Sequence, residues 1–139
     1  MQKEDVDRWL RGYVDAWRTY DPKRIAALFS ADVSYRYHPY DEPLCGRDAV
    51  VASWLGQEGE QAGASTRDEP GTYDACYRTI AIDGDIAVAI GVTRYRPAPD
   101  APSNRVFDNC FVMCFDATGR CQEFTEWFIE RPELQAAPT

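Results

Sequence analysis

Glu126 is the residue of this sequence whose type and setting best suit proton transfer, because it stands between two phenylalanines at alternate positions. Residues two apart in a strand point to the same face, so Phe124, Glu126 and Phe128 share one face. A carboxyl group among aromatic side chains is expected to be buried, and burial raises its pKa. We therefore predict that Glu126 is a catalytic general acid or base. The alternative is a solvent-exposed face, or a carboxylate held by an arginine for structural reasons.

Two tyrosines of an earlier segment, Tyr35 and Tyr37, are predicted to assist Glu126 in catalysis. They alternate with polar residues in the segment 33–40, as in a strand with one aromatic face. Their hydroxyls could position a water or a substrate oxygen; the alternative is that they are core aromatics with satisfied hydroxyls. His38 falls on the opposite face by alternation, so we interpret it as a surface residue at a strand end.

Five further residues are predicted to bind the ligand. Tyr13 and Trp17 lie on the apolar stripe of a helix, where core packing is the default and a pocket wall is the alternative. Asp108 and Asn109 open a very apolar strand, and one of them is expected to point inward; which of the two does so is left open. The predicted ligand-binding set is Tyr13, Trp17, Phe124, Phe128 and Asp108.

The composition excludes several classes of function. The chain has 139 residues with 23 acidic and 15 basic side chains, for a net charge of −8. A nucleic-acid-binding protein or an anionic-membrane-binding protein needs a basic face, so neutral or cationic small molecules and protein partners remain. One histidine cannot anchor a zinc site here, and no phosphate-binding glycine motif occurs. We therefore predict neither a metal nor a cofactor.

Cysteine usage and the terminal segments indicate a cytoplasmic protein. The five cysteines are an odd number and include no C-x-x-C pair, which favours free thiols in a reducing compartment. The charged N-terminus has no apolar signal region, and the apolar runs are too short to span a membrane.

The elements that must position these residues fall into two halves. Helical spacing predicts a helix over about residues 4–19, a short helix that begins at Asp21-Pro22 and buries Ile25, Leu28 and Phe29, and a third helix from Arg47. A polar, glycine-rich segment, 56–71, is predicted to be a long mobile loop.

After residue 71 the period changes to two, and a meander of four strands is predicted, with Asp83-Gly84 as the first hairpin turn. Helices followed by a strand meander predict an α+β fold, in which N-terminal helices pack on a curved antiparallel sheet. We expect one domain over 1–131 and a C-terminal tail over 132–139.

Two stretches resemble the nuclear transport factor 2-like, or SnoaL-like, superfamily. They are YVDAWRTYDPKRIAALFSADVSYRYHPYDEPLCGRDAVVASWL (13–55) and NCFVMCFDATGRCQEFTEWF (109–128). The resemblance rests on Phe-Ser-Ala-Asp after the second helix, Gly-Arg-Asp-Ala at the third and Phe-Asp-x-x-Gly-Arg in the last turn. It implies a cone-shaped domain with a deep pocket between helices and sheet, and a homodimer formed through the sheet. The superfamily holds both enzymes and binding modules.

The resemblance also allows a comparison of site residues. In members similar to limonene epoxide hydrolase, Tyr35 and Glu126 match a tyrosine and an aspartate of the site, but Gly91 and Thr93 stand where Arg-x-Asp is needed. In members similar to ketosteroid isomerase, Tyr13 matches an oxyanion donor. There Tyr37 stands in place of the aspartate base, and Phe111 aligns near the second donor.

Residues and resemblance together predict a small-molecule-binding SnoaL-like domain. One hypothesis is a cofactor-independent acid/base enzyme of isomerase, cyclase or hydrolase type, acting on a small, mostly apolar substrate that contains oxygen. The alternative is a non-catalytic ligand-binding or dimerisation module, in which aromatics fill the pocket and a protein cation holds Glu126.

Overall fold

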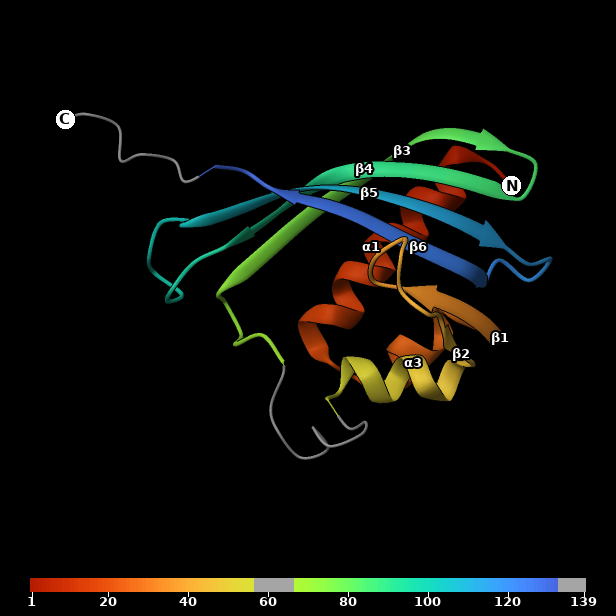
Figure 1. The fold of residues 1–139 in the computed structure, drawn as a ribbon, viewed down its shortest axis with the longest axis horizontal. Coiled ribbons are helices and arrows are strands. Elements are labelled where there is room, and N and C mark those ends of the chain that lie inside the picture. The colour runs from red at the N-terminus through yellow and green to blue at the C-terminus, as the bar shows by residue number, and fades with distance from the viewer. Residues whose placement is uncertain (57–66, 133–139) are drawn as a thin grey trace.

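The computed structural model describes residues 1–56 and 67–132. Figure 1 shows helices on one side of a curved sheet. The helices are α1 (Lys3–Thr19), α2 (Pro22–Ala27) and α3 (Arg47–Trp54). The strands are β1 (Phe29–Arg36), β2 (Leu44–Cys45), β3 (Tyr73–Asp83), β4 (Ile86–Tyr95), β5 (Arg105–Phe115) and β6 (Cys121–Glu130).

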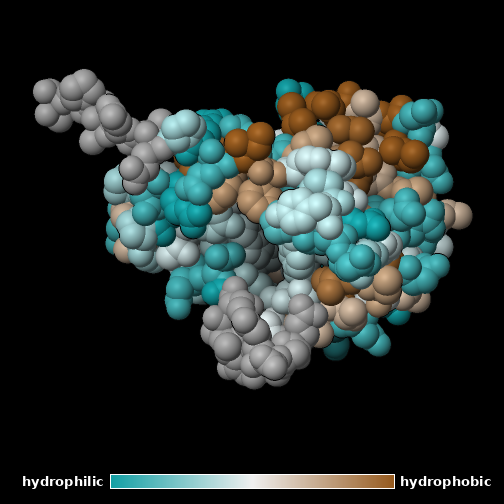
Figure 2. All heavy atoms as spheres, viewed as in Figure 1, coloured by the Kyte–Doolittle hydropathy of each residue, from teal (hydrophilic) through white to brown (hydrophobic). Residues whose placement is uncertain are grey.

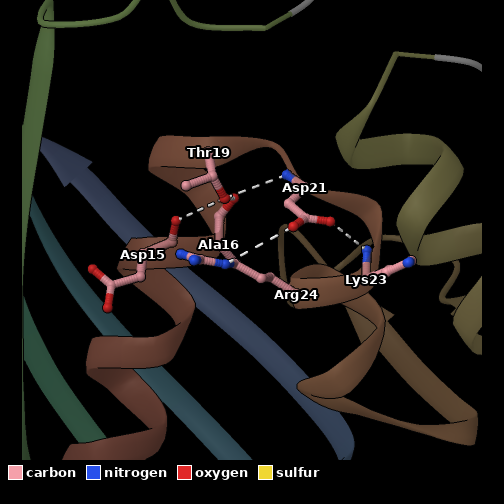
Figure 3. A network of polar contacts seen from close by, with 6 residues as sticks. All are labelled: Asp15, Ala16, Thr19, Asp21, Lys23 and Arg24. Atoms are coloured by element: carbon pink, nitrogen blue, oxygen red, sulfur yellow. Dashed lines mark hydrogen bonds and ion pairs between the residues drawn. The ribbon is translucent and has the colours of Figure 1, made fainter.

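Local side-chain contacts fix the junction between α1 and α2 (Figure 3). The α1 helix ends at Tyr20, whose backbone is left-handed with φ 48°. The Asp21 side chain then accepts a hydrogen bond from the Lys23 amide at 2.9 Å, which caps α2, and Pro22 occupies the first helical position. The hydroxyl of Thr19 accepts from the Asp21 amide at 3.3 Å, so both helix ends share one polar turn.

The sheet has the order β2-β1-β6-β5-β4-β3. The meander β3 to β6 is antiparallel throughout, as predicted, with Gly84 at φ 62° in the first hairpin turn. The β1 strand, however, pairs with β6 in parallel, so the sheet is mixed and not wholly antiparallel. Local patterns do not predict this pairing, because the two strands are separated by most of the chain.

The second helix and first strand differ from their predicted bounds. Phe29 begins β1 and does not end α2, and β1 stops at Arg36, so Tyr37 and His38 lie beyond the strand. The short strand β2 was not predicted, because two residues carry no periodic signal. The predicted 56–71 loop falls mainly on residues 57–66, outside the described residues, as does most of the predicted tail 132–139.

The core lies between α1 and the inner face of the sheet. Val6, Leu10, Tyr13 and Val14 of α1 are buried, and each is at most 8% exposed. From the sheet they meet aromatic rings at alternate strand positions, which include Phe111 and Phe124. None of the described helices is long and apolar enough to cross a membrane.

The opposite, outer face of the sheet carries apolar side chains in the solvent. Ile129 is 74% exposed, and Ile80, Ile86 and Trp127 are each more than 40% exposed. Brown, hydrophobic atoms gather in Figure 2 at the upper right, over the hairpin end of β3 and β4 in Figure 1.

Candidate functional site

Glu126 is half-buried on the inner face of β6, between the fully buried Phe124 and the more exposed Phe128. Burial raises the pKa of the Glu126 carboxyl to about 7, because the surroundings disfavour its charge. In the part of the chain that the structure describes, no lysine or arginine forms an ion pair with Glu126. The Glu126 carboxyl is therefore free to titrate, since no structural salt bridge to a described lysine or arginine holds its charge.

A chain of hydrogen bonds across four neighbouring strands holds Glu126. The hydroxyls of Tyr77 on β3 and Thr93 on β4 lie 2.6 Å apart. Thr93 donates to the side-chain oxygen of Asn109 on β5 at 2.9 Å, and Asn109 donates through Nδ2 to Oε2 of Glu126 at 2.8 Å. We call these four residues the cross-sheet relay.

The relay has a direction. A threonine hydroxyl has one proton, and Thr93 gives it to Asn109, so it must accept the proton of Tyr77. The Asn109 amide is thereby turned with its NH₂ towards Glu126. That bond lowers the pKa of Glu126 and partly opposes the effect of burial. Oε2 is the carboxyl oxygen of Glu126 that Asn109 holds by a hydrogen bond.

Gly91 makes the relay possible. It pairs with both Tyr77 and Asn109 in the sheet, so it lies between these two residues of the relay. A Cβ added at Gly91 would lie 2.4 Å from Cδ1 of Tyr77 and 2.2 Å from the carbonyl oxygen of Cys76. Only a glycine leaves room for the tyrosine ring to cross β4 and reach Thr93.

A cavity of about 490 Å³ opens in front of the relay. This volume is typical of sites for small molecules. In the orientation of Figure 1, the surface is hollowed beneath the left-hand ends of β4, β5 and β6 (Figure 2). Its lining includes Asp68, Tyr95, Phe107, Asn109, Glu126 and Phe128.

Of the predicted catalytic residues, Glu126 lines the cavity and Tyr35 lies deeper. Tyr35 is 1% exposed and stacks on Phe124 with ring centroids 4.6 Å apart. Tyr13, a predicted ligand-binding residue, also stacks on Phe124, with ring centroids 5.7 Å apart. Burial raises the pKa of both phenols well above the usual value, and the charge of Glu126 acts in the same direction. Tyr13, Tyr35 and Phe124 therefore form the core behind Glu126 and do not line this cavity.

Two other predicted residues reach the site indirectly or from outside it. Tyr37 lies past the end of β1 and its hydroxyl is 2.8 Å from Oγ of Ser53. Trp17 stacks on Tyr73 at 4.4 Å and donates through Nε1 to Asp68, which lines the cavity.

Asp108 is placed differently from the prediction. It lies exposed on the outer face of the sheet, where Arg131 binds both its oxygens at 2.8 and 2.9 Å. Asn109 occupies the inward position instead. The signal was in the strand: Asn109 shares its face with Phe107, Phe111, Met113 and Phe115, so this is the core face.

His38 also lies nearer the site than alternation predicted. Its ring centroid is 5.1 Å from that of Phe128, and its Nδ1 is 2.8 Å from the Asp41 carboxylate. His38 acts electrostatically on Glu126 and lowers its pKa, although less than Asn109 does. The strand ends at Arg36, so the period of two no longer applies to His38.

No group of three or more potential metal ligands gathers within the described ranges 1–56 and 67–132.

Comparison with known proteins places the chain among domains of similar fold. The family model of the SnoaL-like domain matches residues 10–124. No protein with a curated description matches the chain.

Two solved structures are similar over nearly the whole chain. One is an NTF-2 like protein of unknown function from Burkholderia xenovorans LB400, with a TM-score of 0.65 and 17% identity over 98% of this chain and 91% of that one. The other is a candidate ketosteroid isomerase from Kribbella flavida DSM 17836, with a TM-score of 0.61 and 18% identity over 99% of this chain and 84% of that one. At these identities the likeness shows the fold.

Proposed function

The chain belongs to the SnoaL-like domain family, and on that premise we propose that its cavity binds a small, mostly apolar molecule that contains oxygen. Glu126 acts on this molecule as a general acid/base, without a cofactor. One observation carries the proposal: a carboxyl with a pKa of about 7 lines a cavity of small-molecule size, and Asn109 holds it through Oε2.

The cross-sheet relay supports different roles for the two carboxyl oxygens of Glu126. Asn109 holds Oε2, so Oε1 is the oxygen that can take a proton from the ligand and return it. Near pH 7 both protonation states of Glu126 are populated, which suits a group that acts first as base and then as acid. A proton removed from one carbon and returned to another balances an isomerisation without any co-reactant.

The predicted tyrosines contribute to the proposal as positioning groups. Tyr13 and Tyr35 keep their protons at neutral pH because burial raises their pKa values. Their rings enclose Phe124 and thereby fix the strand that carries Glu126.

A non-catalytic binding module is the second candidate, and the same aromatic stack favours it. Tyr13, Phe124 and Tyr35 fill the interior behind Glu126, so the space between helix and sheet is not one continuous deep pocket. In that case the cavity binds a ligand, and Glu126 contributes polarity without transferring protons.

Deuterium exchange tests the acid/base proposal without a known substrate. Small cyclic ketones in D₂O are incubated with the protein, and loss of the proton signals beside the carbonyl is followed by NMR. We expect catalysed exchange that falls by roughly 10²–10⁴ in Glu126→Gln, the usual contribution of one positioned acid/base. Equal exchange in the variant would remove Glu126 from the mechanism, and binding without exchange would favour the second candidate.

A homodimer through the outer face of the sheet is also proposed. The exposed Trp127 and Ile129 neighbour Cys110 and Asp108 in the sheet, and Ile80 and Ile86 of β3 and β4 are also exposed. Apolar patches of this kind mark interaction surfaces. Sedimentation should give twice the chain mass of 15.8 kDa, and Ile129→Glu should give the monomer. A wild-type monomer at high concentration would exclude the dimer.

A further inference from the structure

Among the described residues, two carboxyl groups line the cavity, and each accepts hydrogen bonds from neutral partners. Glu126 receives a hydrogen bond from Asn109. Asp68 receives one from Nε1 of Trp17 at 3.0 Å and one from the Tyr20 hydroxyl at 3.4 Å. The Asp68 amide in turn donates to the Tyr20 hydroxyl at 2.9 Å, so the backbone and the side chain are both fixed by the end of α1.

The arginines of the cavity are already paired with acids outside its lining. Arg96 binds Asp74 of β3, and Arg105 binds both oxygens of Glu130 at 2.9 Å. No lysine or arginine of the described residues forms an ion pair with Asp68 or Glu126, and His38 is the cation that acts on Glu126. An ionised cavity is therefore negative, in keeping with the net charge of −8.

The walls between the two acids are aromatic. The Tyr95 and Phe107 rings meet edge to face with centroids 5.6 Å apart, and Phe107 meets Phe128 in the same way at 5.7 Å. Aromatic faces attract cations through their quadrupole, with a gain that grows when water is excluded. The Phe107 ring already has the Arg105 guanidinium over it, 5.1 Å from its centroid.

From this geometry we propose that the cavity selects a ligand with a positively charged amine or quaternary ammonium group beside its apolar body. Asp68 is the counter-ion of that group, and Tyr95 and Phe107 form its aromatic wall. The inference rests on the proposed function, because the same ligand would present its reacting atoms to Glu126. It narrows the ligand class from oxygen-containing molecules in general to those that also carry a cation.

A cationic ligand also predicts a pH dependence of binding. Burial raises the pKa of both carboxyls above their usual values, and a bound cation would lower both again. Binding then releases protons, and affinity increases as the pH rises through about 7, the pKa of Glu126. The charge of His38 lowers the pKa of Glu126 in the same direction as the ligand.

The test compares three probes that share a benzyl group: benzyltrimethylammonium, N-benzylacetamide and benzylsulfonate. Binding to the full chain is measured by calorimetry at pH 6 and pH 8. We expect the cation to bind at least about tenfold more tightly than the neutral amide, a difference of about 1.4 kcal/mol. We expect no binding of the sulfonate and tighter binding of the cation at pH 8.

Two variants and one control locate the effect. Asp68→Asn should weaken the cation about tenfold and leave the amide unchanged, since the charge is lost and the shape is kept. Asp15→Asn makes the same change of charge on the exposed part of α1, outside the cavity lining, and should leave binding unchanged. Tyr95→Leu keeps an apolar wall without a π-face and should weaken the cation more than the amide.

Three results would overturn the inference. The amide could bind as tightly as the cation, or Asp15→Asn could weaken binding as much as Asp68→Asn, or none of the probes could bind. Each leaves the proposed role of Glu126 to the deuterium-exchange experiment, which uses uncharged ketones. If the wild-type protein catalyses no exchange but still prefers the cation, the ligand class stands and the proposed catalysis is removed.

Discussion

Phe124 and Glu126 lie two residues apart on the same face of β6, yet they belong to different environments. Phe124 is fully buried between the rings of Tyr13 and Tyr35. Glu126 lines the cavity, and polar groups of three other strands surround it in place of the rings. Depth along one strand thus separates the part of the face that stabilises the fold from the part that could do chemistry.

The largest expected effect is on stability at the buried end of this comparison. Phe124→Ala should reduce the free energy of unfolding by about 3–5 kcal/mol, because it leaves a cavity between two stacked rings. Urea denaturation measures the loss. The matched control, Phe128→Ala, removes a ring that is 40% exposed and should cost much less. Equal losses would show that the two ends do not differ in packing.

The polar part of this comparison, the cross-sheet relay, should be disrupted by a substitution at Gly91. An alanine there would require Tyr77 and the backbone of Cys76 to move, since the added carbon would lie 2.2–2.4 Å from them. We expect Gly91→Ala to cost about 1–3 kcal/mol of stability, the usual range for overpacking. Gly12→Ala is the control: its Cβ would meet Leu28 at an ordinary 3.6 Å, so it should stabilise α1 by about 0.5–1 kcal/mol. A neutral Gly91→Ala would mean that the relay does not need this close approach.

The buried carboxyl should also make stability depend on pH. Glu126 has a folded-state pKa of about 7 against an ordinary 4.5, so the folded state binds more protons than the unfolded state between these values. Stability therefore falls as pH rises from 4.5 to 7, and the cost is fully present above pH 7. Glu126→Gln should remove this fall, with a gain of up to about 3 kcal/mol at pH 8 and little at pH 4.5. Parallel stability profiles of wild type and variant would contradict the raised pKa.

The sequence predicts the two faces of each strand but not the depth of a residue within a face. The period of two in β6 identifies Glu126 as inward, and the structure agrees. The period of two does not predict that Tyr35 and Phe124 lie in the core while Phe128 lines the cavity, because this depends on how α1 packs on the sheet. Similarly, the relay joins four strands whose register is set by long-range pairing, so no local pattern predicts Thr93 beside Asn109.

Strand ends are the other place where prediction from the sequence fails. The strand expected over 33–40 ends at Arg36, and this moves His38 to the side of Phe128. The parallel pairing of β1 with β6 is not predicted either, because it joins strands that most of the chain separates. The choice between Asp108 and Asn109, in contrast, was decidable from the aromatic alternation of β5.

The smallest expected effect is a change of pKa through the relay. Asn109→Leu removes the donor to Oε2, so burial acts alone and the pKa of Glu126 should rise by about one unit, as for the loss of one hydrogen bond to a charged group. Carbon NMR of the labelled carboxyl measures it. Thr93→Val keeps Asn109 but frees its amide to turn, and should raise the pKa by less. An unchanged pKa in Asn109→Leu would mean that water replaces the amide, and the relay would then position Glu126 without tuning it.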